Sequence, residues 1–291
     1  MYDMKICRFN DDRLGVVHDN TTILDVTGAL EALPPLTWPV PLGDALVTHL
    51  AVITSEISRL ASDAPTVSLK DIMLKSPVAN PSKTIGAPIN YQKHIEESKE
   101  DDGIVSSRPI SHISDWGMFL KANSSLVGAG EGVALRFTDA RNDHEMELAV
   151  IIGKQGSHIP ASEAKTYIAG YAMGLDMTTR GKELQSFRKS ADTYSVLGPW
   201  MVTADEIPHP NKLSLKISVN GDVRQESNTD QLVYNVEKLI EYCSERYTLY
   251  PGDIIMTGTP DGVGPVEPGD IMTCELEGIG IMEVGVRAWG S

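Results

Sequence analysis

Cysteine is scarce in this sequence. Its 291 residues include only Cys7, Cys243 and Cys274, which lie far apart and form no CxxC pair. An odd number of widely spaced thiols argues against a disulfide framework and against a cysteine-ligated zinc site. The scarcity of cysteine therefore favours a reducing compartment. Without disulfides, the stability of the fold depends on its hydrophobic core. A chain of this length with 41% hydrophobic residues can bury a substantial one.

Positive charge and long apolar runs are also in short supply. The chain has 25 lysines and arginines against 40 acidic residues, a net charge of −15, and no basic cluster. Nucleic acid and anionic membranes would be repelled by such a surface. No apolar run approaches the roughly 20 residues that span a bilayer, and MYDMKICRFN lacks the apolar segment of a signal peptide. We expect a cytoplasmic protein with neither nucleic acid nor a membrane as its partner.

Strand signals open the chain. Short apolar runs separated by turn residues predict β-hairpins at 5–9, 13–19 and 21–27. A proline-rich stretch then leads into a predicted helix with one apolar face, formed by Leu46, Leu50, Ile53 and Ile57. We interpret residues 1–75 as a small N-terminal domain and residues 76–291 as a larger second domain.

Apolar runs of strand length dominate the larger part of the chain. They occur at 118–123, 147–153, 170–178, 200–206, 213–223, 253–258, 270–280 and 281–287. Helical patterns are fewer, at 161–170 and 235–247. Strands this numerous, broken by NGD, PGD and EGIG turns, predict an α+β fold with a mixed or antiparallel sheet rather than alternating βαβ units.

Two acidic residues stand at the start of one of these apolar runs, in NDHEMELAVIIGK (142–154). In a strand, Glu145 and Glu147 would project from the same face, with Met146 on the other. Two carboxylates this close to an apolar strand must be protonated, exposed or compensated by a cation. Taken alone, the pair is more often a solvated strand end than a site.

A third acid changes this balance. Asp176 ends the apolar run of GYAMGLDMTTR and is followed by small polar residues, as expected of an acid at a strand end that faces a cavity. If the three carboxylates converge, they form an all-oxygen site that suits a hard cation such as Mg²⁺ or Mn²⁺. Spacing alone leaves their convergence open.

Four ordered segments resemble the fumarylacetoacetate hydrolase family in its acylpyruvate hydrolase branch. They are ELAVIIGK with the preceding ExE, YAMGLDMTTR, RKSADTYSVLGPW and YPGDIIMTGTPDGVG, and the resemblance runs from about residue 82 to the end. It implies a β-rich mixed roll with a small N-terminal β domain, a catalytic domain over 76–291, and a homodimer. It also implies that Glu145, Glu147 and Asp176 bind one divalent cation per subunit, Mg²⁺ or Mn²⁺.

The same resemblance implies further site residues. In GAPINYQKHIEE, His94 and Glu97 match the family's base and the acid that orients it, and their spacing places both on one face of a helix. The adjacent DDGIVSS (101–107) resembles the family's flap over the ligand. Lys189 matches a lysine that stabilises developing enolate charge. The resemblance assigns substrate contacts to Lys121, Arg180 and Thr259.

The chain departs from the family where that family often reads ARDLQ. Here TRGKELQ places Gly181 at the aspartate and Glu183 at the usual glutamine position. The departure concerns the distal part of the substrate and glutamine-dependent decarboxylation.

The expected function is metal-dependent hydrolysis of a C–C bond in an acylpyruvate, such as fumarylpyruvate from aromatic-compound catabolism, with pyruvate leaving as its enolate. The substrate partner is thus a small 2-oxo acid. A 2-hydroxyhepta-2,4-diene-1,7-dioate-type isomerase or an oxaloacetate-type decarboxylase would use the same metal site. From another class, a metal-binding scaffold of the same fold stays open.

Overall fold

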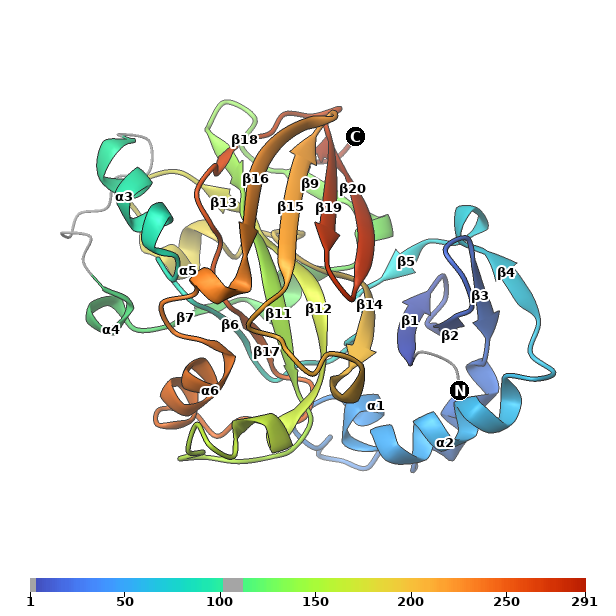
Figure 1. Cartoon of the computed structure of the whole chain (residues 1–291). Coiled ribbons are helices and arrows are strands. Elements are labelled where there is room, and N and C mark those ends of the chain that lie inside the picture. Colours follow the sequence, from blue (N-terminus) through green and yellow to red (C-terminus); the bar gives the residue numbers. More distant parts are fainter. Residues whose placement is uncertain (1–3, 102–111) are drawn as a thin grey trace.

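A twelve-stranded sheet is the largest element of the fold (Figure 1). The structure is a computed structural model that describes residues 4–101 and 112–291. Its main path runs β4 (Thr66–Ser68), β3 (Thr22–Asp25), β2 (Arg13–Val17), β1 (Lys5–Phe9), β14 (Ser195–Thr203), β12 (Ile168–Asp176), β11 (Met146–Ile152), β17 (Ile254–Met256), β6 (Thr84–Gly86) and β7 (Phe119–Lys121). Off this path, β5 (Leu74–Lys75) pairs with β1 and β8 (Leu126–Val127) with β14. The central strands β11, β12 and β14 are buried along their whole length.

A five-stranded sheet covers one face of these central strands. Its order is β16 (Asp222–Asn228), β15 (Ser214–Val219), β19 (Ile271–Leu276), β20 (Gly280–Ala288) and β9 (Val133–Leu135). Asn220 and Gly221 turn β15 into β16 with φ angles of 51° and 89°, the positive values that a two-residue hairpin loop requires. Alternation along β19 and β20 buries one face of this sheet and leaves the other in solvent.

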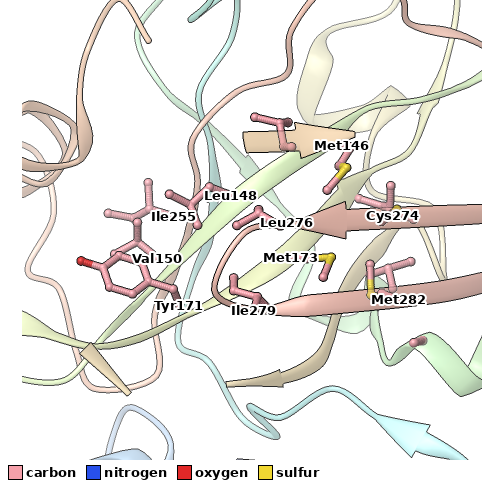
Figure 2. Close-up of a cluster of buried hydrophobic side chains, with 14 of the residues drawn as sticks. Met146, Leu148, Val150, Tyr171, Met173, Ile255, Cys274, Leu276, Ile279 and Met282 are labelled. Carbon is pink, nitrogen blue, oxygen red and sulfur yellow. The ribbon is translucent and has the colours of Figure 1, made fainter. Parts of the chain in front are cut away.

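The main core lies between the two sheets (Figure 2). Met146, Leu148 and Val150 of β11 point toward Leu276 and Met282 of the five-stranded sheet. Successive strand residues face opposite sides, so Glu147, Ala149 and Ile151 turn away from this core. Ala149 and Ile151 belong to a second apolar cluster, so Glu147, near the start of β11, is the one polar residue on this other face of the strand.

A three-stranded sheet carries the acid-rich segment past the end of β11. It consists of β13 (Thr178–Thr179), β10 (Asn142–His144) and β18 (Gly264–Pro265). All residues of β10 are buried, including the polar side chains of Asn142, Asp143 and His144. Polar side chains are therefore buried in the interior where β10 leads into β11.

Helices are few and short. They are α1 (Ala45–Thr48), α2 (Leu50–Leu60), α3 (Gln92–Glu100), α4 (Ile113–Trp116), α5 (Gln185–Arg188) and α6 (Val236–Ser244). Helix α2 buries Ile53 and Ile57, as its sequence pattern predicts. No helix in the described part of the chain is long and apolar enough to cross a membrane.

The predicted helix over 161–170 is wrong. Only a 3₁₀ turn, Ala164–Tyr167, forms there, and β12 begins at Ile168. Pairing of β12 with β11 on one side and β14 on the other outweighs the local helical pattern. The predicted helix over 235–247 is confirmed as α6, whose apolar face is buried.

The fold is α+β and dominated by its sheets, as predicted. The N-terminal strands continue the large sheet, because β1 pairs with β14 through Lys5 with Val202 and Ile6 with Met201. A division of the chain near residue 75 stays a prediction.

Candidate active site

Three buried carboxylates converge where β10, β11 and β12 meet. Glu145 lies between β10 and β11, Glu147 is the second residue of β11, and Asp176 ends β12. The amide of Asp176 donates to the carbonyl of Glu145 at 2.9 Å, which holds the two strand ends together. One carboxylate oxygen from each residue lies within 4.8 Å of the others. The convergence that spacing left open is therefore present.

Lysine side chains surround this carboxylate trio, defined as Glu145, Glu147 and Asp176. The buried ammonium of Lys189 donates to Glu145 Oε2 at 2.6 Å, to Asp176 Oδ2 at 2.8 Å and to Thr178 Oγ1 at 2.6 Å. An ammonium group has three hydrogens, so these contacts use all of them.

Lys121 approaches the trio from β7. It pairs with Asp176 Oδ1 and donates to the carbonyl oxygen of Tyr194 at 3.0 Å. Its side chain is fully buried, and burial lowers the pKa of Lys121 from its ordinary value despite the attraction of Asp176. The structure thus places Lys121 against the trio, while its predicted substrate contact stays a prediction.

The members of the trio differ in how well they are compensated. Burial alone would raise the pKa of Glu145, but Lys189 and Arg180 outweigh it and hold that pKa well below its usual range. Burial raises the pKa of Glu147 well above its usual range, and the like charges of Asp176 and Glu145 add to the effect. Among the described residues, Glu147 is the member of the trio that forms no ion pair, and Lys189 attracts it only weakly compared with these effects.

Glu147 has one strong hydrogen-bond donor, the amide of Gly258, which lies 2.5 Å from Oε2. Gly258 has a φ of 100°, and a Cβ there would lie 2.7 Å from the Cβ of Asn90. The position requires glycine, because a side chain would be strained and would clash. The turn after β17 thus brings a backbone dipole to the acid.

A divalent cation fits this trio. Oε1 of Glu145 is buried and accepts no hydrogen bond from the described residues, although Arg180 Nη2 lies 3.0 Å away, and Glu147 forms no ion pair with any of them. Mg²⁺ and Mn²⁺ prefer carboxylate oxygens, and all three predicted ligands supply them. Glu145, Glu147 and Asp176 would hold the ion, with Lys189 competing for oxygens of two of them.

His94 and Glu97 lie together on α3, as their spacing predicts. Nδ1 of His94 is 2.8 Å from Oε2 of Glu97, and the other oxygen of Glu97 accepts from the amide of Gly262 at 2.8 Å. With Nδ1 hydrogen-bonded to a carboxylate, Nε2 is the nitrogen left to accept a proton. The pair therefore has the geometry of an oriented base.

Asp143 links the trio to α3 through a chain of ion pairs that the sequence analysis missed. Asp143 accepts from Arg141 Nε at 2.8 Å and from Arg180 Nε at 2.7 Å. Arg141 continues to both oxygens of Asp101, at 3.1 and 2.9 Å. Arg180 Nη2 lies 3.0 Å from Glu145 Oε1. Asp143 lies two residues before Glu145, as Glu145 lies two before Glu147. The same alternating spacing could therefore have identified Asp143 from the sequence.

A small cavity of about 50 Å³ joins these groups. Its lining includes His94, Glu145, Arg180, Lys189 and Thr259. Thr259 donates its hydroxyl hydrogen to the carbonyl of Met146 at 2.8 Å, which leaves its predicted substrate contact a prediction. The predicted flap, DDGIVSS, lies outside the described residues except for Asp101.

Comparisons with known proteins identify relatives of this chain. The family described as fumarylacetoacetate (FAA) hydrolase, C-terminal, matches residues 83–287. Maleylpyruvate hydrolase of Aquipseudomonas alcaligenes is 53% identical over 287 residues, 98% of this chain and 100% of that protein. A mitochondrial oxaloacetate tautomerase of Rattus norvegicus is 37% identical over 235 residues, 77% of this chain and 72% of that protein.

A solved structure extends the likeness to the whole fold. Maleylpyruvate hydrolase from Sphingobium sp. SYK-6, crystallised with manganese(II) and pyruvate, has a TM-score of 0.81 at 35% identity. The match covers 98% of this chain and 99% of that chain. The similarity therefore includes the N-terminal strands as well as the region around the trio.

Proposed function

This chain belongs to the fumarylacetoacetate hydrolase family, and from that premise we propose that it is a metal-dependent hydrolase of acylpyruvates. The observation that carries the proposal is the buried trio of Glu145, Glu147 and Asp176 in one site with the His94–Glu97 pair. The reaction would break the C–C bond between the acyl carbonyl and the pyruvate methylene, giving a carboxylic acid and pyruvate.

The metal would supply one part of the chemistry. Mg²⁺ or Mn²⁺ on Glu145, Glu147 and Asp176 would polarise the carbonyl of a 2-oxo acid and favour its enolate. The manganese(II) named for the Sphingobium enzyme supports a divalent cation as the cofactor.

His94 would supply the base. With Nδ1 held by Glu97, its Nε2 takes a proton from water as the water oxygen bonds to the acyl carbon. The C–C bond electrons move to the 2-keto oxygen of the departing pyruvate, which leaves as its enolate and is then protonated. Glu97 fixes the ring and stabilises the imidazolium that forms.

Lys189 would stabilise the developing oxyanion. Its three hydrogens already have acceptors, so it must release a contact with Glu145, Asp176 or Thr178 to reach a substrate oxygen. Binding at the trio therefore involves an exchange of ion pairs. Arg180 would take part in this exchange, because it forms ion pairs with both Glu145 and Asp143.

A tautomerase or isomerase is the second candidate. The rat relative is named an oxaloacetate tautomerase, and proton transfer on a 2-oxo acid needs the same base without attack by water. Decarboxylation of an oxaloacetate-like acid would share the enolate. We further propose a cytoplasmic homodimer with one Mg²⁺ or Mn²⁺ per subunit and no nucleic-acid or membrane partner.

The test is an assay of chelator-stripped protein with and without Mn²⁺ or Mg²⁺, on fumarylpyruvate, a hydroxydiene-dioate and oxaloacetate. We expect metal-dependent release of pyruvate from fumarylpyruvate, reduced about 10²- to 10⁴-fold by His94→Ala. His209→Ala, at an exposed histidine away from the site, serves as the matched control. Turnover limited to proton shuffling or CO₂ release would shift the assignment. Metal binding without any turnover would favour a scaffold.

A further inference from the structure

Arg188 lies at the end of α5, next to Lys189, in the lining of the cavity. Backbone carbonyls hold its guanidinium: Nε donates to the carbonyl of Glu183 at 2.8 Å and Nη1 to that of Thr179 at 3.3 Å. Within residues 4–101 and 112–291, no carboxylate forms an ion pair with it. The side chain is thus fixed in place by neutral acceptors.

The other cations around the cavity are paired. Arg180 contacts Asp143 and Glu145, and Lys189 contacts Glu145 and Asp176. Burial, followed by repulsion from Arg180, lowers the pKa of Arg188 from its ordinary value. Glu145, Glu183 and Asp176 attract this guanidinium from a distance, but none of them forms an ion pair with it in the described chain. A partly buried guanidinium in this situation gains from an anion that contacts it directly.

Arg188 also lies where the cavity opens. The cavity adjoins an outer groove of about 370 Å³, and the two share Trp116, Phe119, Gln185 and Arg188 in their linings. His94, Glu145 and Thr259 line only the inner space. A substrate whose 2-oxo acid end lies at the trio would therefore extend its acyl arm past Trp116 and Phe119, which line both spaces, toward Arg188.

We propose that Arg188 binds a carboxylate at the far end of the acyl arm and thereby selects dicarboxylic acylpyruvates. The assignment rests on the proposed hydrolase function and concerns its substrate class. A guanidinium presents a planar set of donors that matches a carboxylate. Binding energy from this remote group would position the scissile bond over His94.

The experiment compares two substrates. Fumarylpyruvate carries a terminal carboxylate on its acyl arm, whereas the arm of acetylpyruvate is a methyl group. Arg188→Met keeps an apolar stem and removes the charge, and Arg188→Lys keeps the charge. Lys212→Met removes a charge from an exposed position outside the lining of both the cavity and the groove. Steady-state kinetics of the metal-loaded enzyme give kcat and KM for each pair.

We expect Arg188→Met to lower kcat/KM for fumarylpyruvate about 10²-fold, mainly through KM, and to change acetylpyruvate by no more than about twofold. Arg188→Lys should recover part of the loss, and Lys212→Met should match the wild type. Equal losses on both substrates, or an unchanged preference for the carboxylated arm, would overturn the assignment.

Acetylpyruvate separates this inference from the function beneath it. Wild-type cleavage of acetylpyruvate tests the hydrolase reaction without a distal carboxylate, so the hydrolase function can stand while Arg188 fails. If the wild type cleaves neither acylpyruvate, the proposed function is wrong and the role of Arg188 falls with it.

Discussion

At the start of β11 the two faces of the strand lie equally deep in the molecule and contain opposite chemistry, whereas farther along both faces are apolar. Leu148 and Glu147 are neighbours with 0% and 1% of their surface exposed. Leu148 packs with Met146 and Val150 into the core between the sheets (Figure 2). Glu147 joins the carboxylates of Glu145 and Asp176. Burial is the same on both faces, so the partners of each side chain decide what the face does.

Titratable groups show the same contrast. Cys274 lies in the apolar layer, where burial raises its pKa and keeps the thiol neutral. Glu145 is just as buried, yet Lys189 and Arg180 keep it ionised. Glu145 thus stays charged because its counter-charges lie within contact distance. The ion pairs thus offset the desolvation of the buried carboxylates, and binding of metal and substrate would have to replace some of these ion pairs.

Substitutions at two neighbouring residues, Glu147 and Leu148, test whether the two faces of β11 have separate roles. Glu147→Gln should lower kcat/KM about 10²- to 10³-fold, because it removes a metal ligand. It should leave the unfolding free energy of the metal-free protein unchanged or higher, since ionising Glu147 costs folding energy. Enzyme kinetics and urea denaturation measure the two effects.

Leu148→Ala is the matched control on the other face. It should lower the unfolding free energy by about 2–5 kcal/mol through the cavity it leaves, with kcat/KM of the folded fraction nearly unchanged. Equal destabilisation by both substitutions would contradict the view that the two faces have separate roles.

A smaller effect is expected one step away from the carboxylates. Asp143→Asn removes the charge between Arg141 and Arg180, so Arg180 loses its anchor and Glu145 its orientation. We expect Mn²⁺ affinity, measured by calorimetry, to fall about tenfold or more. Asp192→Asn, which breaks the exposed pair with Arg136, should have no effect. Wild-type Mn²⁺ affinity in Asp143→Asn would show that the ion-pair chain does not position the ligands.

Sequence reasoning reached the features that depend on local period and on strand ends. The period of two placed Glu145 and Glu147 on one face, and the end of an apolar run placed Asp176 at a strand end, while the convergence of the three is seen only in the structure. The helical spacing of His94 and Glu97 is confirmed by their contact. Each of these features involves residues close in sequence or the end of a strand, so the sequence pattern is enough to predict it.

The rest depends on contacts between distant segments. The helix predicted over 161–170 failed because two neighbouring strands recruit part of that segment into the sheet. Nothing local indicates that Lys189 has three acceptors or that Arg188 has no carboxylate partner in the described chain. Such properties follow from strand register and loop placement, which a single sequence does not specify.

The smallest expected effect tests the apolar side of the comparison through its thiols. Cys7, Cys243 and Cys274 are free and buried, and burial raises the pKa of Cys7 and of Cys243 from 9.0 to about 12. Stability from these neutral thiols is fully present below the unfolded pKa of 9.0 and declines as pH rises toward 12. Near pH 8 (about one unit below that pKa), a thiol reagent should therefore label none of them in the folded protein and all of them in concentrated guanidinium chloride. Labelling of Cys274 without denaturant would mean that the two sheets separate locally, and the core would then be less rigid than the charged face beside it.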